Sequence, residues 1–139
     1  MITISTYFIY EYMKEKFPSL APYLKNGFID KSAKQSIGVF LGPDTRSERV
    51  LSIGGIDCTT TRMIPINILV RWTENQKVCD EQAIEIYNAL LLEKQNFNIV
   101  NDEVKIACIN LLDSTPVSLG RDDKNICEAM IRANFYYYV

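Results

Sequence analysis

Acidic residues near the end of the chain are the side chains best spaced for acid–base chemistry. Asp113, Asp122 and Asp123 fall in one predicted loop, and Glu128 follows within a few residues. The sequence Gly-Arg-Asp-Asp-Lys at 120–124 sets two acids beside two bases, which is typical of a solvated loop rather than a pair of catalytic carboxyls. The chain has no histidine, so it lacks the usual general base and the commonest metal ligand. We therefore predict no catalytic and no metal-binding residue, while serine–lysine or carboxylate chemistry stays open.

The spacing of cysteine and glycine gives no binding motif either. The four cysteines form no CxxC pair. Cys108 and Cys127 fall in apolar strand patterns, where cysteine commonly acts as a small hydrophobe. We expect reduced thiols and synthesis in the cytosol. Gly54-Gly55 is too short to cradle a phosphate, and neither GxGxxG nor a P-loop motif occurs, so the sequence predicts no cofactor.

Composition places the chain among ordinary single-domain proteins. Its 139 residues are 47% hydrophobic and 23% charged, which is enough for one core. Lys and Arg number 15 against 17 for Asp and Glu, so the net charge is -2 and there is no basic surplus to neutralise phosphates. No run approaches the roughly 18 apolar residues that a membrane-spanning helix needs. We expect one domain over residues 1–139, no specific nucleic-acid binding and no membrane contact.

Two long predicted strands form the framework that positions the acidic residues named above. From residue 127 onward every second residue is apolar or small, and Arg62 to Trp72 alternates in the same way. Both segments are about twice the common strand length of 5–6 residues, so we expect them to be the backbone of one sheet. The residues expected on the inner side of the last strand are Cys127, Ala129, Ile131, Ala133, Phe135, Tyr137 and Val139.

Two helices are predicted at residues 3–17 and 77–93, where apolar residues recur at helical spacing. Their candidate N-caps are Thr3 or Ser5 and Thr73 or Asn75. The remaining predicted elements are short strands at 27–29, 34–41, 50–53 and 104–112, a connector at 19–26, a turn at 96–103, and loops at 42–61 and 113–124. This order predicts an α+β fold, with a mostly antiparallel twisted sheet and two main helices packed on it, in a single domain.

The last strand also carries amphipathic residues on its second side, where Met130, Tyr136 and Tyr138 point away from Ile131 and Phe135. A monomer gains little from a second partly apolar face, so this pattern indicates self-association or docking. The alternative is that the two helices pack on opposite faces of the sheet. The sequence leaves both open.

The layout resembles the small tail-terminator and minor capsid proteins that join head and tail in long-tailed bacteriophages and their prophages. The residues that carry the resemblance are, after an N-terminal helix, Gly-Pro-Asp at 42–44, Val-Arg-Trp-Thr at 70–73, a helix at 80–92, and above all Pro-Val-Ser-Leu-Gly-Arg-Asp-Asp at 116–123 before a long last strand. Together they span the chain nearly end to end in order.

The resemblance implies a non-enzymatic structural protein of the virion tail or neck. Such proteins assemble into a ring, typically a hexamer, at the head-proximal end of the tail tube, where the ring ends tube polymerisation and joins the tail to the head connector. The implied partners are therefore further copies of this chain, the tail tube protein and the head–tail connector or stopper protein. An acidic or neutral ring lumen lets DNA slide through, and the pI near 5.2 is compatible with one.

The candidate interface residues come from three places: the predicted loop at 42–61, the predicted turn at 119–124, and the second side of the last strand. They are Arg46, Glu48, Arg49, Arg121, Asp122, Met130, Tyr136 and Tyr138. For the turn at 119–124, the interpretation as a structural element that delivers the last strand in register is favoured over a contact role.

Two alternative functions remain from the sequence. One is another neck or head-closure minor capsid component, which would touch different partners. The other is a small cytosolic enzyme or ligand-binding domain. An enzyme predicts a deep pocket with buried ionisable groups, such as Asp113 or Asp122 placed inside it.

Overall fold

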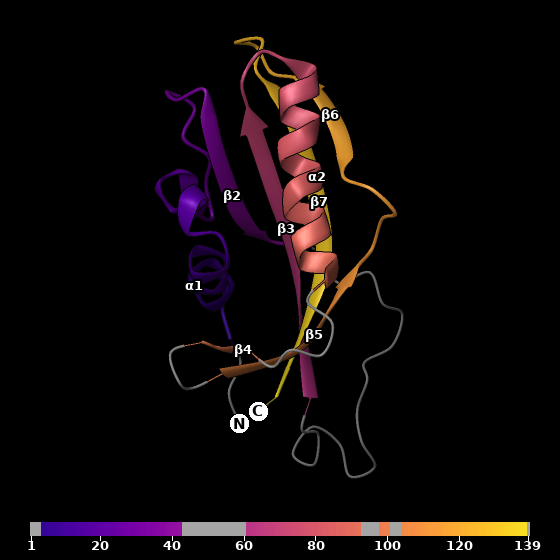
Figure 1. Ribbon diagram of the computed structural model, residues 1–139. Coiled ribbons are helices and arrows are strands. Elements are labelled where there is room, and N and C mark those ends of the chain that lie inside the picture. Colours follow the sequence, from indigo (N-terminus) through magenta and orange to yellow (C-terminus); the bar gives the residue numbers. More distant parts are fainter. Residues whose placement is uncertain (1–3, 43–60, 93–97, 101–103, 139) are drawn as a thin grey trace.

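The computed structural model describes residues 4–42, 61–92, 98–100 and 104–138 (Figure 1). The elements in chain order are α1 (Thr6–Lys16), the 3₁₀ helix η1 (Pro18–Tyr23), β1 (Leu24–Asn26), β2 (Gln35–Leu41), β3 (Thr61–Trp72), α2 (Gln76–Leu92), β4 (Asn98–Val100), β5 (Val104–Leu111), β6 (Val117–Arg121) and β7 (Cys127–Tyr138).

One open sheet holds all the strands of the described residues, in the order β1-β2-β3-β7-β5-β4, with β6 paired to β7 beside β5. Every pairing is antiparallel except that of β1 with β2. The two predicted long strands, β3 and β7, are neighbours at the centre and pair over nearly their whole length, with Ile68 opposite Ile131. The predicted α+β fold with a mostly antiparallel sheet and two main helices is confirmed.

Both main helices lie on one face of this sheet (Figure 1). The Tyr12 ring of α1 packs edge-on against Phe135 of β7, with ring centroids 5.9 Å apart. Ala83 of α2 belongs to the same core cluster, as does Ala129 of β7. From Ile64 to Trp72 on β3 and along β7, the residues that point to this side are buried, because period-two alternation brings every second side chain under the helices. The alternative with helices on opposite faces is therefore wrong.

The two helices begin differently. α1 starts at Thr6, later than predicted, and its N-cap Ser5 makes no side-chain capping hydrogen bond. α2 starts at Gln76, and Oδ1 of Asn75 accepts hydrogen bonds from the backbone N–H groups of Lys77 (3.0 Å) and Val78 (3.4 Å). Asn75 is therefore the working cap of the two predicted for α2.

Several predicted short elements are wrong in detail. β1 covers 24–26 instead of 27–29, because Gly27 has φ of 80° and ends the strand. Residues 98–100, predicted to be part of a turn, form β4. The predicted loop at 113–124 contains β6. The predicted strand at 50–53 lies outside the described residues.

A short segment covers part of the sheet on the side opposite the helices. A Cβ atom added at Gly38 of β2 would lie 2.8 Å from the carbonyl oxygen of Phe28 and 2.9 Å from Cδ1 of Ile29. The segment after β1 therefore packs directly on the backbone of β2, and a side chain at position 38 would push it away. Over β3 and β7 the same side of the sheet is more open.

Candidate functional site

The side of the sheet that faces away from both helices is called here the outer face. On β3 and β7 its members are neither fully buried nor fully exposed, apart from the buried Arg71 and Asn134 and the more exposed Tyr138. The partly exposed members that carry the surface are Met63, Pro65, Asn67, Leu69, Glu128, Met130, Arg132 and Tyr136. Within the described residues no helix covers them.

The strand register joins the outer-face residues into one strip. Met63 lies opposite Tyr136, and Leu69 lies opposite Met130. Directly opposed side chains on one face of a sheet are in contact range. Two apolar cross-strand pairs therefore stand near the two ends of the strip. Tyr138, 39% exposed, extends it at the end of β7.

An ion pair forms one margin of the strip. Nε and Nη2 of Arg132 donate to the two carboxylate oxygens of Asp113, at 2.9 and 2.7 Å. This paired hydrogen bonding to Arg132 lowers the pKa of Asp113 below its ordinary value. The carbonyl oxygen of Asp113 in turn accepts a hydrogen bond of 2.7 Å from the hydroxyl of Tyr87 on α2. Asp113 thus ties the loop after β5 to both β7 and α2.

Asp122 lies inside a hydrogen-bond network at one end of the sheet. Its Oδ2 accepts from Nε and Nη2 of the buried Arg71, both at 2.9 Å. Its Oδ1 accepts from the backbone N–H groups of Lys124 and Ile126, also at 2.9 Å. The pKa of Asp122 is lowered, chiefly by the Ile126 N–H. These contacts hold the turn before β7.

Arg71 uses its remaining donor on a different segment, since Nη1 donates to the carbonyl oxygens of Ala33 and Asp30. The guanidinium therefore joins β3, the turn before β7 and the segment before β2. Close by, the exposed Arg121 donates from Nη1 to the carbonyl oxygens of Glu74 (2.7 Å) and Asn125 (3.2 Å).

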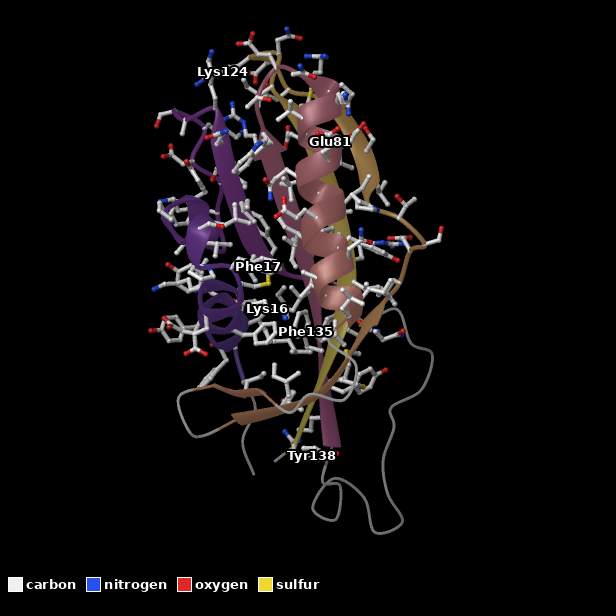
Figure 2. The ribbon with its side chains drawn as sticks, viewed as in Figure 1. Lys16, Phe17, Glu81, Lys124, Phe135 and Tyr138 are labelled. Atoms are coloured by element: carbon white, nitrogen blue, oxygen red, sulfur yellow. The ribbon has the colours of Figure 1, made fainter. Side chains whose placement is uncertain are left out.

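The candidate interface residues thus do not form one patch. Met130, Tyr136 and Tyr138 lie along the outer face. Arg121 and Asp122 lie at the end of the sheet where β7 begins, and Figure 2 shows Lys124 of that turn at the opposite end of the molecule from Tyr138. The other three candidates, Arg46, Glu48 and Arg49, lie outside the described residues.

The sequence-based interface set omitted the β3 half of the strip. Met63 lies opposite the predicted Tyr136 and Leu69 lies opposite the predicted Met130, with Pro65 between them on β3. The alternation along residues 62–72 already places these side chains opposite Ile64 and Ile66, so the signal was present. What the sequence lacked was the evidence that β3 and β7 are neighbours in this register.

Two of the four carboxyls singled out for chemistry, Asp113 and Asp122, are paired with arginine rather than held in a cavity. The hollow between α2 and β6, about 200 Å³ in volume, is lined by Asp80, Ala83, Ile84, Thr115, Pro116, Ser118 and Ala129. Asp113 and Asp122 are not among its lining residues. No group of three or more His, Cys, Asp or Glu side chains within the described ranges is arranged to hold a metal ion.

The buried thiols behave as core groups. Cys79 and Cys127 are fully buried and form no disulfide. Burial raises the pKa of the Cys79 thiol to about 11, so it is protonated at neutral pH and is a poor nucleophile. In the part of the chain that the structure describes, no helix has the length and apolar character needed to cross a membrane.

An α+β domain whose helices cover one sheet face, while the other presents apolar and amphipathic side chains, is typical of a protein that assembles with others. A family model described as bacteriophage tail terminator protein matches residues 18–139. The match begins just after α1 and runs to the last residue of the sequence. The chain therefore belongs to the bacteriophage tail terminator family and is a structural, virion-associated protein of the phage tail. A search of curated proteins finds no match.

Proposed function

We propose that this protein forms a ring, with six subunits, at the head-proximal end of the phage tail tube. There it stops polymerisation of the tube protein and joins the tail to the head connector or stopper protein. It works as a structural component, without enzymatic activity and without a cofactor. It is made in the cytoplasm of the bacterial host and stays in the neck of the virion.

The outer face is the observation that supports this proposal most directly. A closed ring needs two different surfaces of each subunit to meet around the circle. β3 and β7, at twelve residues each and about 3.3 Å per residue, extend about 40 Å. With their neighbouring strands they are large enough for a standard interface of roughly 800 Å² per partner. We assign the outer face to one side of the contact between subunits.

The charge of the chain agrees with a ring around a DNA passage. A net charge of -2 gives no overall basic surplus, and basic surplus is what makes proteins adhere to the phosphate backbone. A neutral or acidic lumen lets DNA pass without being held.

The test is to delete the gene from the phage or prophage that encodes it and to image induced particles by negative stain. We expect overlong tail tubes beside filled heads without tails, because nothing then stops tube growth. Expression of the wild-type chain from a plasmid should restore normal virions. Expression of the same chain with a stop codon in β3 serves as the matched control and should restore none.

Two results would contradict the proposal. Normal virions after deletion would remove any role in tail assembly. Filled heads accompanied by unattached tails of normal length would assign the chain to a neighbouring neck or head-closure role, because tube length would then be set by another protein.

A further inference from the structure

β6 leaves one edge of the sheet open. It pairs with β7 on one side, and no strand of the described residues pairs with its other side. Val117 is partly exposed and the rest of β6 is exposed, with Leu119 at 48%. Figure 1 shows β6 at the margin of the sheet beside α2. Backbone N–H and C=O groups along such an edge are ready to pair with another extended chain.

A hollow adjoins this edge on the helix side. Ala83 and Ile84 of α2, Pro116 before β6 and Ala129 of β7 supply its apolar walls, and its volume is about 200 Å³. A cavity of about 150 Å³ with apolar walls accepts a benzene molecule. The hollow therefore has room for an aliphatic side chain.

Ser118 belongs to both features. It is a residue of β6 and it lines the hollow. It also pairs with Ala129, whose side chain is buried on the helix side of the sheet. A strand added to the open edge would therefore direct its helix-side residues toward Ile84, which is 43% exposed.

The charged residues around the hollow indicate which kind of side chain could bind beside it. Asp80 lines the hollow, and the exposed Glu81 precedes Ile84 by three residues, which places the two side chains next to each other on α2. Figure 2 shows Glu81 on α2, on the side toward β6. Lys77 is 3.9 Å from Glu81 but both side chains are mostly exposed, so solvent screens this pair. The Arg121 guanidinium at the end of β6 is held by the carbonyl oxygens of Glu74 and Asn125. The carboxylates of Asp80 and Glu81 therefore favour a basic residue beside the aliphatic one.

We propose that the open edge of β6 and the adjoining hollow bind a short extended segment of a different protein of the tail or neck. The segment adds as a strand to β6, places an aliphatic side chain in the hollow and carries a basic residue next to it. This inference rests on the proposed assembly function, and it names a second contact surface, separate from the outer face.

The same edge is poorly suited to a second copy of this chain. The other margins of the described sheet, β1 and β4, have only three residues each. The irregularity in the β6–β7 pairing between Ser118 and Gly120 also limits how long a strand can pair with this edge. A short segment that becomes ordered on binding fits better than a long, preformed strand.

The test uses the full-length chain with a photoreactive amino acid in place of Leu119, incorporated into virions that lack the wild-type protein. After illumination, cross-linked peptides from purified particles are identified by mass spectrometry. We expect cross-links to one contiguous segment of another virion protein, with an aliphatic residue next to a basic one. Cross-links only to this chain, or no cross-links at all, would overturn the proposal.

A pair of variants tests the hollow. Ile84→Arg puts a cation in its wall and should lower the cross-link yield at least tenfold. Val78→Arg is the matched control, since Val78 is 39% exposed on the same helix and does not line the hollow, and it should change the yield less than twofold. Equal yields for the two variants would contradict a role for the hollow.

Two further measurements show whether a loss of cross-linking comes from misfolding, and whether the inference can fail while the proposed function holds. Both variants change exposed positions, so their Tm should stay within about 2 °C of wild type. If Ile84→Arg fails to fold, amide hydrogen exchange on the wild-type chain decides: residues 117–121 should exchange at least tenfold more slowly in particles than in the free protein. If exchange at residues 117–121 is the same in particles and in the free protein, the inference is overturned. If gene deletion still gives overlong tails, the proposed function stands in spite of that result.

Discussion

Arg71 and Arg132 lie on the same side of neighbouring strands and both pair with an aspartate, but their surroundings differ. The side chain of Arg71 is 2% exposed and that of Arg132 is 37% exposed. Arg71 also bonds the carbonyl oxygens of Ala33 and Asp30. Because a buried polar group without a partner costs much more than an exposed one, the two ion pairs should contribute very differently to stability.

We therefore expect Arg71→Met to lower the free energy of unfolding by about 2–3 kcal/mol, since it leaves two partly buried carbonyl oxygens without their donor. Arg132→Met is the matched control and should have a smaller effect, because its ion pair is partly exposed and screened by solvent. Urea unfolding followed by circular dichroism measures both. Equal midpoints for the two variants would show that Arg71 does not hold this end of the sheet.

Acid stability should report on the carboxyls of Asp30, Asp113 and Asp122. Hydrogen bonds from Ser32, Arg132 and the Ile126 N–H, respectively, are the largest causes that lower their pKa from the ordinary 3.8. The unfolded chain therefore takes up these protons at higher pH than the folded chain. Stability is fully present above the unfolded pKa and is lost as pH falls through the folded values.

We accordingly expect the free energy of unfolding to hold level from pH 7 to about pH 5 and to fall as the pH drops below 3.8. Asp122→Asn should be less stable at neutral pH but should show a shallower acid slope, because one depressed carboxyl has been removed. Urea unfolding at a series of pH values gives the slopes. A slope as steep as that of wild type would argue against the Asp122 network.

At the scale of elements, the two main helices are stabilised in different ways, α2 by a side-chain cap and α1 by packing. α2 is capped by the Asn75 side chain, whereas Ser5 caps α1 without a side-chain bond. α1 is held instead by packing, with Ile9 and Met13 fully buried, and by the Tyr137 hydroxyl, which accepts a hydrogen bond of 3.4 Å from the Ile4 N–H. The first helix should therefore tolerate loss of its cap residue.

We expect Asn75→Ala to lower the free energy of unfolding by about 1 kcal/mol, because two N–H groups of the first turn of α2 lose their acceptor. Ser5→Ala is the matched control, and it should change stability by a few tenths of a kcal/mol at most. Thermal unfolding of the two variants side by side measures the difference. A larger loss in Ser5→Ala than in Asn75→Ala would reverse the assignment of the caps.

At the scale of the whole molecule, the helices give the sheet two unlike faces. The inner face is closed by α1 and α2, and the outer face carries Tyr136 and Met130 toward solvent. On the opposite side of the molecule Tyr7, on α1, is 48% exposed. Tyr136 and Tyr7 therefore offer the same side chain on the two sides of one domain.

If the outer face joins subunits, Tyr136→Ser should weaken concentration-dependent association of the purified chain at least tenfold, because interface aromatics carry much of the binding energy. Tyr7→Ser should leave association within twofold of wild type. Sedimentation velocity over a concentration series measures both, and virion yield on complementation gives a second readout when association occurs only on the tail. Equal behaviour of the two variants in both assays would place the subunit contact elsewhere.

Much of the local structure could be predicted from the sequence. The alternation in residues 62–72 and 127–138 predicted β3, β7 and the side of β7 on which Met130 and Tyr136 lie, because strand facing is a local property with period two. Both main helices were expected for a similar reason, since their apolar spacing is local. The sequence pattern of residues 116–123, with the order of elements, also indicated the tail terminator family.

Tertiary structure decided what depends on partners far apart in the chain. β6 has weak local signals, and it is a strand because β7 supplies its hydrogen bonds. The pairing of Arg71 with Asp122 joins residues 51 positions apart. Above all, the packing of both helices on one face leaves the outer face open, and no local pattern carries this choice because either face of a sheet can accept an amphipathic helix. The sequence by itself determined the long strands β3 and β7, the two main helices and the way their side chains face, and only the fold determined which face of the sheet the helices left open.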